Sequence, residues 1–305
     1  MLAITGSTGF IGSYISSRLP QPQIRLIRNP AEKTDSGIQT ILGDLRTLDS
    51  YKPFLKDATS LIHLAWEGTP RTSFNPQESL LPTFNLFKQF AETCPSGHII
   101  FTSSGGNIYG SSPYGEKFRE SDPPNPLSAY SALKLDVENQ LRILCAQHGL
   151  RATILRISNP YGTLLPGHRG QGLIGVAFAK LIKREPLTIF DDLDSERDYL
   201  HLSDLSAAFH TVLGTPPLEG ECRLYNVSSG KGHPLREVLS LIEKCSHTQL
   251  QLEIAKEQQL SSSPKKSILS YEKIHNELGW SPRFSLEQGI SEMWESIKHL
   301  AQKNL

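Results

Sequence analysis

Tyr130 and Lys134 are the residues whose types and spacing most directly suggest chemistry. They lie four positions apart in a segment with a helical pattern, about Leu127 to His148, so both side chains are expected on one helical face. A free phenol titrates near pH ~10, and a fixed cation beside it favours the phenolate and lowers the phenol pKa toward a useful range. Such a pair can take a proton from a substrate hydroxyl while a nicotinamide takes the hydride.

Tyrosine–lysine pairs occur by chance in many amphipathic helices, so the pair alone is a weak signal. A glycine-rich turn near the start of the chain makes a dinucleotide-dependent function of the pair more specific. The run from Thr5 to Gly12, TGSTGFIG, places glycines at positions 6, 9 and 12 directly after an apolar strand and before a helix. A phosphate can approach a backbone only where no Cβ intrudes, and a helix N-terminus offers free N–H groups. The strand–turn–helix setting therefore predicts a dinucleotide site, although the spacing is GxxGxxG and not the commoner GxGxxG.

The second strand, Ile24 to Ile27, ends in Arg28-Asn29-Pro30, where an NAD-specific site would carry an acid. An arginine at this place suits a 2′-phosphate and indicates NADP, while a solvated loop arginine is the alternative. Asp44 follows the third strand in Gly43-Asp44-Leu45. It is a candidate for contacting the adenine, and a turn or capping role is equally compatible with the sequence.

The elements that must position these residues alternate between strands and helices in the first half of the chain. Strands alternating with helices predict βαβ units, hence an α/β, doubly wound parallel sheet of the Rossmann type. The expected strands are Met1–Thr5, Ile24–Ile27, Gln39–Leu42, Ser60–Leu64, His98–Thr102 and Ala152–Ile157, and the expected helices are Phe10–Leu19, Gln77–Thr93 and Leu127–His148.

Beyond Asn159 the alternation stops. A Gly- and Pro-rich stretch, Pro160 to Gly175, is predicted as loops. We therefore expect residues 1–160 to form the NAD(P)-binding domain, with later segments returning to it, and residues 161–305 to form a smaller, mainly substrate-binding α/β part. The later expected elements are helices near Ser203–Leu213, Leu235–Cys245 and Leu286–Leu300 and a strand at Leu224–Val227.

The composition excludes several classes of protein. The 31 basic and 31 acidic residues cancel, so little affinity for nucleic acid is expected from counterion release. No run of about 18 apolar residues predicts a membrane span, and no secretory leader is recognised. Four cysteines lie far apart without a CxxC pair, which indicates reduced thiols in a cytoplasmic protein and no metal site.

Together these motifs resemble the extended short-chain dehydrogenase/reductase superfamily, in its NAD(P)-dependent nucleotide-sugar epimerase/dehydratase branch (UDP-glucose 4-epimerase-like). The resemblance covers most of the chain and is specific for the superfamily, far less so for any one substrate. It implies a Rossmann domain that holds NAD or NADP and a C-terminal part that holds a nucleotide-sugar. The matching residues are Thr5–Gly12, Gly43–Leu45, His63–Ala65, Phe101–Ser104, Ile108–Gly110, Tyr130 with Lys134, Leu155-Arg156, Asn159-Pro160, Arg197–His201 and Leu278–Pro282.

The resemblance also implies a role for each matching residue. Tyr130 would be the acid/base, and Lys134 would also bind the nicotinamide ribose. Arg197 would grip the diphosphate, for which an arginine fork is well suited. The other implied cofactor-binding residues are Gly6, Gly9, Phe10 and Ile11 at the pyrophosphate, Asp44 and Leu45 after the third strand, Leu64 and Ala65 beside the cofactor and Ser103 on the nicotinamide side; the other implied substrate-binding residues are Asn159, Gly172 and Leu173.

Two departures from the family pattern are visible. The third catalytic residue, a Ser or Thr, should lie four positions before Tyr109, but Gly105 stands there; Ser104 or Asn107 could supply its hydrogen bond. The Gly105-Gly106-Asn107 run also lacks the Thr-Asp-Glu of 4,6-dehydratases. A late Arg-x-x-Asp before a proline is replaced by Gln259, Ser262 and Pro264, so one cation for the diphosphate is missing unless Lys265 or Lys266 substitutes.

Three functions fit this sequence. A nucleotide-sugar 4-epimerase, acting through a transient 4-keto sugar, is favoured by the motif set. An NADPH-dependent 4-keto-6-deoxysugar reductase is favoured by Arg28, and a non-catalytic dinucleotide-binding protein is the third possibility. The resemblance alone also predicts a homodimer through a four-helix interface of the Gln77–Thr93 and Leu127–His148 helices.

Overall fold

The computed structural model describes residues 1–28, 37–66, 76–110, 116–165, 170–255 and 264–303, with the backbone alone for 76–79 and 300–303. Asn29, Pro30, Gln259 and Ser262 therefore lie outside the described residues. The chain forms two compact units, and neither is continuous in sequence. The first unit is Met1–Ser104, Ser128–Arg156 and Ala208–Tyr225, and the second is Gly105–Leu127, Ile157–Ala207 and Asn226–Leu305.

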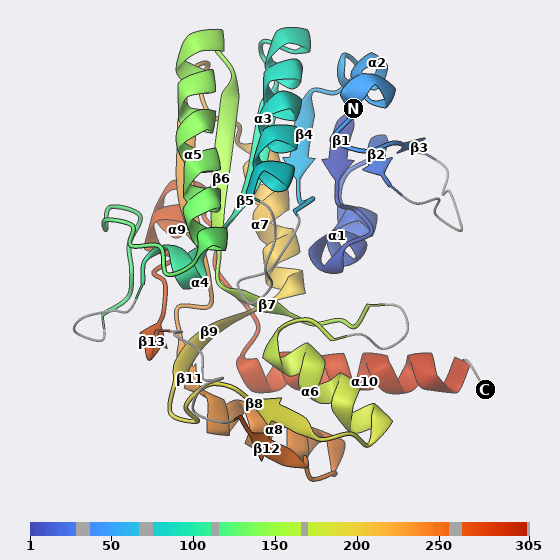
Figure 1. Cartoon of the computed structure of the whole chain (residues 1–305), viewed down its shortest axis with the longest axis vertical. Coiled ribbons are helices and arrows are strands. Elements are labelled where there is room, and N and C mark those ends of the chain that lie inside the picture. The colour runs from blue at the N-terminus through green and yellow to red at the C-terminus, as the bar shows by residue number, and fades with distance from the viewer. Residues whose placement is uncertain (29–36, 67–75, 111–115, 166–169, 256–263, 304–305) are drawn as a thin grey trace. The chain divides into compact units, whose positions relative to one another are not determined.

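A seven-stranded sheet forms the centre of the first unit, in the order β10-β6-β5-β4-β1-β2-β3. Figure 1 labels the strands from β6 to β3 in this order. The pairs β1–β2, β1–β4, β2–β3 and β4–β5 are parallel. The run from β3 to β6 has the strand order of a doubly wound dinucleotide-binding sheet, which confirms the predicted fold class. The strands are β1 Leu2–Thr5, β2 Gln23–Ile27, β3 Ile38–Leu42, β4 Ser60–His63, β5 His98–Ser104, β6 Arg151–Ile157 and β10 Cys222–Val227.

Helices α3 and α5 lie side by side in front of this sheet in Figure 1. Helix α5 begins in a capping box, in which the Ser128 hydroxyl accepts a hydrogen bond from Ser131 N and the Ser131 hydroxyl accepts one from Ser128 N. It ends at Gly149, whose φ of 69° suits glycine. The helical segments around this sheet are α1 Phe10–Ile15, η1 Ser16–Arg18, η2 Leu48–Ser50, α2 Lys52–Leu55, α3 Pro76–Thr93, α5 Ala129–His148 and α7 Leu202–Gly214, of which α7 begins in the second unit.

The core of the first unit is aromatic where α3 and α5 cover β4 and β5. Phe87, Phe90, Phe101 and Leu141 are fully buried there. The buried face of α5 also carries Lys134 and Glu138, one helical turn apart. Charged side chains are rarely buried unless they are paired, so this face is a place to look for function.

The second unit is built from shorter elements. Strand β9 pairs with β7, β11 and β13, and a separate two-stranded sheet joins β12 to β8. An apolar core of Phe178, Val238, Ile242 and Ile290 packs α6, α8 and α10 together. The elements are α4 Gly105–Ile108, β7 Asn159–Tyr161, α6 Gly172–Lys183, β8 Leu187–Ile189, β9 Glu196–His201, β11 Gly232–Pro234, α8 Leu235–Ser246, β12 Leu252–Ile254, β13 Lys266–Ser267, α9 Glu272–Leu278 and α10 Leu286–Lys303.

The structure corrects part of the expected secondary structure. The stretch Pro160 to Gly175 is not all loop, because β7 continues to Tyr161 and α6 begins at Gly172. Strand β5 continues past Thr102 to Ser104, which brings Ser103 and Ser104 into the sheet. Among the described residues, no helix combines the length and the apolar character that a membrane crossing requires.

Candidate active site

The glycine turn is tightly packed against the end of β4. Gly6 has a φ of 70°, and a Cβ there would lie 2.5 Å from Ala65 N; a Cβ on Gly12 would lie 2.0 Å from Gly6 O. Both glycines are therefore required by the fold itself. A Cβ on Gly9 would contact only Gly6 O, at 3.2 Å, so this position is open on its other side.

Three features of this turn fit a dinucleotide pyrophosphate. Gly9 is the N-cap of α1 without a side-chain cap, so the first N–H groups of the helix, including those of Phe10 and Ile11, have no intrahelical acceptor. The Ser7 hydroxyl is buried and has no hydrogen-bond partner among the described residues. Leu64 and Ala65, predicted to flank the cofactor, lie against Gly6. The residues present therefore fit the phosphate groups of NAD or NADP.

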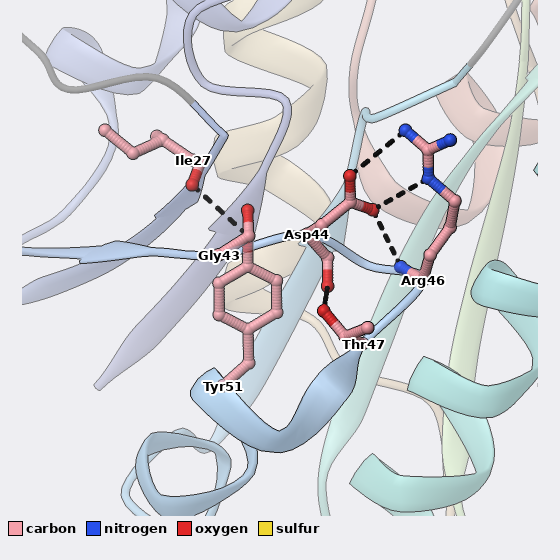
Figure 2. A network of polar contacts seen from close by, with 6 residues as sticks. All are labelled: Ile27, Gly43, Asp44, Arg46, Thr47 and Tyr51. Atoms are coloured by element: carbon pink, nitrogen blue, oxygen red, sulfur yellow. Dashed lines mark hydrogen bonds and ion pairs between the residues drawn. The ribbon is translucent and has the colours of Figure 1, made fainter.

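Asp44 and Arg28 follow the neighbouring strands β3 and β2. The Asp44 carboxylate accepts hydrogen bonds from Arg46 N at 2.8 Å, Nε at 3.1 Å and Nη2 at 3.1 Å (Figure 2). Arg46 and, more weakly, Arg28 hold the pKa of Asp44 below its usual value. Asp44 is thus neutralised by Arg46, and Arg28 adds a further positive charge.

Tyr51 fixes the backbone that carries Asp44. Its hydroxyl donates to Ile27 O at 3.2 Å and also to Gly43 O, and Gly43 N donates to Ile27 O at 2.9 Å (Figure 2). A Cβ on Gly43 would lie 2.8 Å from the Tyr51 ring, which explains the glycine before Asp44. Leu45, the other predicted cofactor contact here, is half-buried and packs against the core.

Lys134 projects from the buried face of α5 toward the end of β5. Its Nζ donates to Thr102 O at 3.0 Å and lies 3.8 Å from the Trp66 ring centroid, 4.8 Å from that of Phe101 and 5.8 Å from that of Tyr130. Burial lowers the pKa of Lys134 well below its usual value, and Glu138 partly offsets this effect.

Tyr130 lies beside Lys134 on α5, as the spacing predicts. The structure corrects the expected phenol pKa, however, because burial raises the pKa of Tyr130 to about 12. The nearby ammonium does not outweigh desolvation, since Nζ lies over the ring rather than at the hydroxyl. In this geometry the phenol is protonated at neutral pH.

Ser103 and Ser104 end strand β5, and they differ in their surroundings. The Ser103 hydroxyl is buried and donates to Glu138 Oε1 at 2.6 Å. Ser104 is half-buried. Asn107 lies in α4, and its carbonyl accepts a hydrogen bond from Leu127 N at 3.2 Å. The choice between Ser104 and Asn107 as the third catalytic group stays open.

The predicted substrate residues all lie in the second unit. Asn159 of β7 and Arg197 of β9 share one face of a parallel pair in which Asn159 is opposite Tyr199. Asn159 Nδ2 donates to Asp198 O at 2.8 Å, and Arg197 Nη1 donates to Glu196 O at 3.0 Å. Gly172 and Leu173 are the first two residues of α6.

The two candidate replacements for the missing late arginine also differ. Lys266 Nζ pairs with Glu196 at 3.2 Å. Lys265 is exposed, and its carbonyl accepts a hydrogen bond from Arg197 Nη1 at 3.5 Å. Lys265 is therefore the better placed substitute.

Two residues at this site were missed by sequence reasoning. Glu138 is four positions after Lys134, so the same helical spacing could have found it. Trp66 directly follows Ala65, but only the structure brings its ring onto Lys134.

A Rossmann sheet with a glycine turn after β1 and a tyrosine–lysine pair on α5 defines a class: nicotinamide-dinucleotide-dependent enzymes of the short-chain dehydrogenase/reductase type. The model of the NAD dependent epimerase/dehydratase family matches residues 2–228. The chain belongs to this family, and its cofactor is NAD or NADP.

Individual relatives carry different activities. The chain is 29% identical to a dTDP-4-dehydro-6-deoxyglucose reductase of Escherichia coli over 97% of this chain and 96% of the relative. It is 28% identical to a UDP-glucose 4-epimerase of Azospirillum brasilense over 94% of this chain and 88% of the relative. A crystal structure of Thermus thermophilus UDP-glucose 4-epimerase in complex with NAD superimposes with a TM-score of 0.84 at 26% identity, over 97% and 98% of the two chains.

Proposed function

We propose that this enzyme exchanges a hydride and a proton at C4 of a nucleotide-linked hexose. The observation that carries the proposal is the position of Tyr130 and Lys134 on one face of α5, with the Lys134 ammonium fixed at the end of β5 by Thr102 O. The glycine turn after β1, in the same unit, supplies the matching pyrophosphate site.

The proposal gives each residue a role that fits its geometry. The bound dinucleotide supplies or receives the hydride. Tyr130 moves the proton at the sugar oxygen, and its raised pKa makes it a proton donor in the ligand-free state. Lys134 lies beside the phenol ring and is the group expected to bind the nicotinamide ribose. Ser104 or Asn107 adds a hydrogen bond to the sugar oxygen.

The second unit carries the proposed substrate contacts. Arg197 and the exposed Lys265 offer positive charge to a diphosphate, and Asn159 lies on the same strand face as Arg197. Gly172 and Leu173 offer helix N-terminal N–H groups to the nucleotide.

The first candidate activity is that of a UDP-hexose 4-epimerase. The motif set and relatives such as the A. brasilense and T. thermophilus enzymes support it. An epimerase recycles its hydride, so it should hold NAD tightly and turn over without added cofactor.

The second candidate is an NADPH-dependent reductase of a nucleotide 4-keto-6-deoxysugar. The charge at the ends of β2 and β3 favours it, because Asp44 is neutralised by Arg46 and Arg28 adds a further positive charge there, which suits a 2′-phosphate. A protonated Tyr130 also suits the donation of a proton to a keto oxygen. The E. coli relative supports the same direction.

One experiment separates these activities. The purified protein is denatured to release and identify any bound nucleotide, and fresh protein is assayed for UDP-glucose/UDP-galactose interconversion and for NADPH oxidation with dTDP-4-dehydro-6-deoxyglucose. Bound NAD with interconversion identifies the epimerase, and NADPH consumption identifies the reductase. Dinucleotide binding without either activity would favour the non-catalytic alternative, and a protein that binds no dinucleotide would contradict the proposal.

We further propose a cytoplasmic homodimer formed through α3 and α5. Leu81 of α3 and Ile143 of α5 are 53% and 44% exposed, which is unusual for large apolar side chains on adjacent helices. All four cysteines are free thiols, which fits a reducing compartment. Light scattering should give twice the chain mass, and the Leu81→Glu/Ile143→Glu variant should be monomeric; a monomeric wild-type protein at micromolar concentration would refute the dimer.

A further inference from the structure

Trp66 lies where the glycine turn and the tyrosine–lysine helix approach each other within the first unit. The residue follows β4 after Leu64 and Ala65, whose backbone lies against Gly6. Its ring lies edge-on to Tyr130, with the centroids 6.1 Å apart at 86°. Trp66 thus contacts the acid/base residue and is one residue away from the backbone that contacts the turn.

The face of the indole covers the Lys134 ammonium. Nζ lies 3.8 Å from the Trp66 centroid, within the range of a cation–π interaction. Lys134 is only 3% exposed, and Nζ donates to Thr102 O on another side. The indole therefore compensates part of the cost of burying this charge.

The edge of the same indole carries an unused donor. Trp66 Nε1 is buried and has no acceptor among the described residues. An indole nitrogen can only donate, and a buried donor without a partner is costly. The N–H bond lies in the ring plane, while Lys134 lies over the ring face, so Trp66 can hold the ammonium and bond a ligand oxygen at the same time. Unsatisfied buried groups of this kind call for a functional explanation.

We propose that the Trp66 indole N–H donates a hydrogen bond to an oxygen of the nicotinamide half of the bound dinucleotide. This inference rests on the proposed function, since it takes the pyrophosphate to lie at the glycine turn and the reactive ring near Tyr130. A dinucleotide bound in this way runs from the glycine turn to Tyr130, and the part between these two places lies beside Trp66. The ligand oxygen is a ribose hydroxyl or the carboxamide oxygen, which are the neutral acceptors of that half.

Binding measurements on Trp66→Phe test the proposal. Phenylalanine keeps an aromatic face for Lys134 and removes only the N–H and the second ring. The dissociation constant for NADP or NAD, whichever the wild-type protein prefers, should rise roughly tenfold. The dissociation constant for the adenosine half alone, adenosine 2′,5′-bisphosphate or ADP, should stay unchanged, because that half does not reach Trp66. The proposal is overturned if Trp66→Phe weakens the binding of both ligands equally, or if it weakens the binding of neither.

A second measurement uses the wild-type protein and does not depend on the folding of a Trp66 variant. The chain has three tryptophans, so ¹⁵N-labelled protein gives three indole N–H resonances. Trp280→Phe and Trp294→Phe identify two of them, and the third belongs to Trp66. This resonance should move downfield with the whole dinucleotide and stay in place with the adenosine half.

A control variant shows whether an effect is specific to Trp66, and different results would refute the proposed function and this inference. Trp294 stacks on Phe178 in the second unit, with the ring centroids 5.3 Å apart, and Trp294→Phe should bind both ligands as the wild type does. A wild-type protein that binds neither dinucleotide would refute the proposed function itself. A wild-type protein that binds the dinucleotide while the Trp66 resonance stays in place would refute only this inference.

Discussion

The Glu138 carboxylate on α5 accepts two hydrogen bonds from the Arg156 guanidinium on β6, at 3.0 Å from Nε and 2.7 Å from Nη2. The side chains of Glu138 and Arg156 are both buried, and the same carboxylate accepts a hydrogen bond from the Ser103 hydroxyl of β5. Glu138 therefore ties α5 to two strands of the sheet, one helical turn beyond Lys134. The position of the helix that carries Tyr130 and Lys134 therefore depends on this buried ion pair.

Removing one partner of the pair should be far more harmful than removing both. Arg156→Met removes the buried cationic partner of the Glu138 carboxylate and should lower the free energy of unfolding by about 3–5 kcal/mol, whereas Glu138→Leu/Arg156→Met should recover much of the loss. Urea unfolding measures both. The control is Arg142→Ala, since Arg142 is 38% exposed and lies 3.7 Å from Glu138; it should change stability by less than about 1 kcal/mol. A double variant less stable than Arg156→Met would contradict this account.

Tyr130→Phe should lower turnover by roughly 10²- to 10⁴-fold with dinucleotide affinity retained, because only the proton carrier is removed. Lys134→Ala should impair both turnover and binding. Steady-state kinetics with whichever substrate the two assays described above identify, together with calorimetry, check both predictions. Full turnover in Tyr130→Phe would refute the assignment of the acid/base.

Gly9 and Gly12 should respond differently to substitution. Gly9→Val should fold, since its side chain points away from all but Gly6 O, and should lose dinucleotide binding because the branched side chain fills the pyrophosphate path. Gly12→Ala should instead lose stability, by about 1–3 kcal/mol, because its Cβ would overlap Gly6 O. Thermal unfolding and calorimetry separate the two effects. Normal binding in Gly9→Val would show that the site is misassigned.

Arg28 should set the choice of cofactor. Arg28→Ala should weaken NADP binding by roughly 10- to 100-fold, the usual worth of a charged hydrogen bond, and leave NAD binding nearly unchanged. Lys56→Ala, an exposed residue after α2, removes the same charge away from β2 and β3 and serves as the control. If the affinities for NADP and NAD are unchanged in Arg28→Ala, Arg28 is an ordinary loop arginine without a role in cofactor choice.

His63 should make the protein sensitive to acid. Its Nδ1 is hydrogen-bonded to Thr5 Oγ1 and its Nε2 to Thr83 Oγ1, and burial lowers its pKa from 6.5 to about 3. Between these values the unfolded chain binds a proton that the native state does not, so the free energy of unfolding should fall as the pH is lowered below 6.5.

The variant His63→Asn tests this dependence. It should lower stability at neutral pH and make the decline toward about pH 5 shallower, measured by urea unfolding at each pH. His98, whose pKa burial lowers to about 4, should account for part of the slope that remains. An unchanged slope in His63→Asn would show that His63 is not the group that titrates.

Much of the first unit was predictable because its signals are local. The apolar runs of β1, β2, β4 and β5 and the helical pattern of α3 and α5 are several residues long, so their periodicity is legible in the sequence. The second unit was less predictable. Strands β7, β8 and β11 have only three residues each, too few to show an alternation, and they form because β9 and β12 arrive from elsewhere in the chain.

Short spacings in the sequence were enough to predict the glycine turn and the tyrosine–lysine pair. Glycines three apart after a strand and a tyrosine four before a lysine are properties of one turn and one helix, and the structure keeps both. What these groups contact follows only from the three-dimensional packing of the chain. Asp44 is neutralised by Arg46, Ser103 is held by Glu138, and Lys134 lies under Trp66, 68 positions earlier in the chain. The pKa of Tyr130 rises rather than falls for the same reason: desolvation and charge depend on which distant segments pack around a group, and no local pattern encodes that packing.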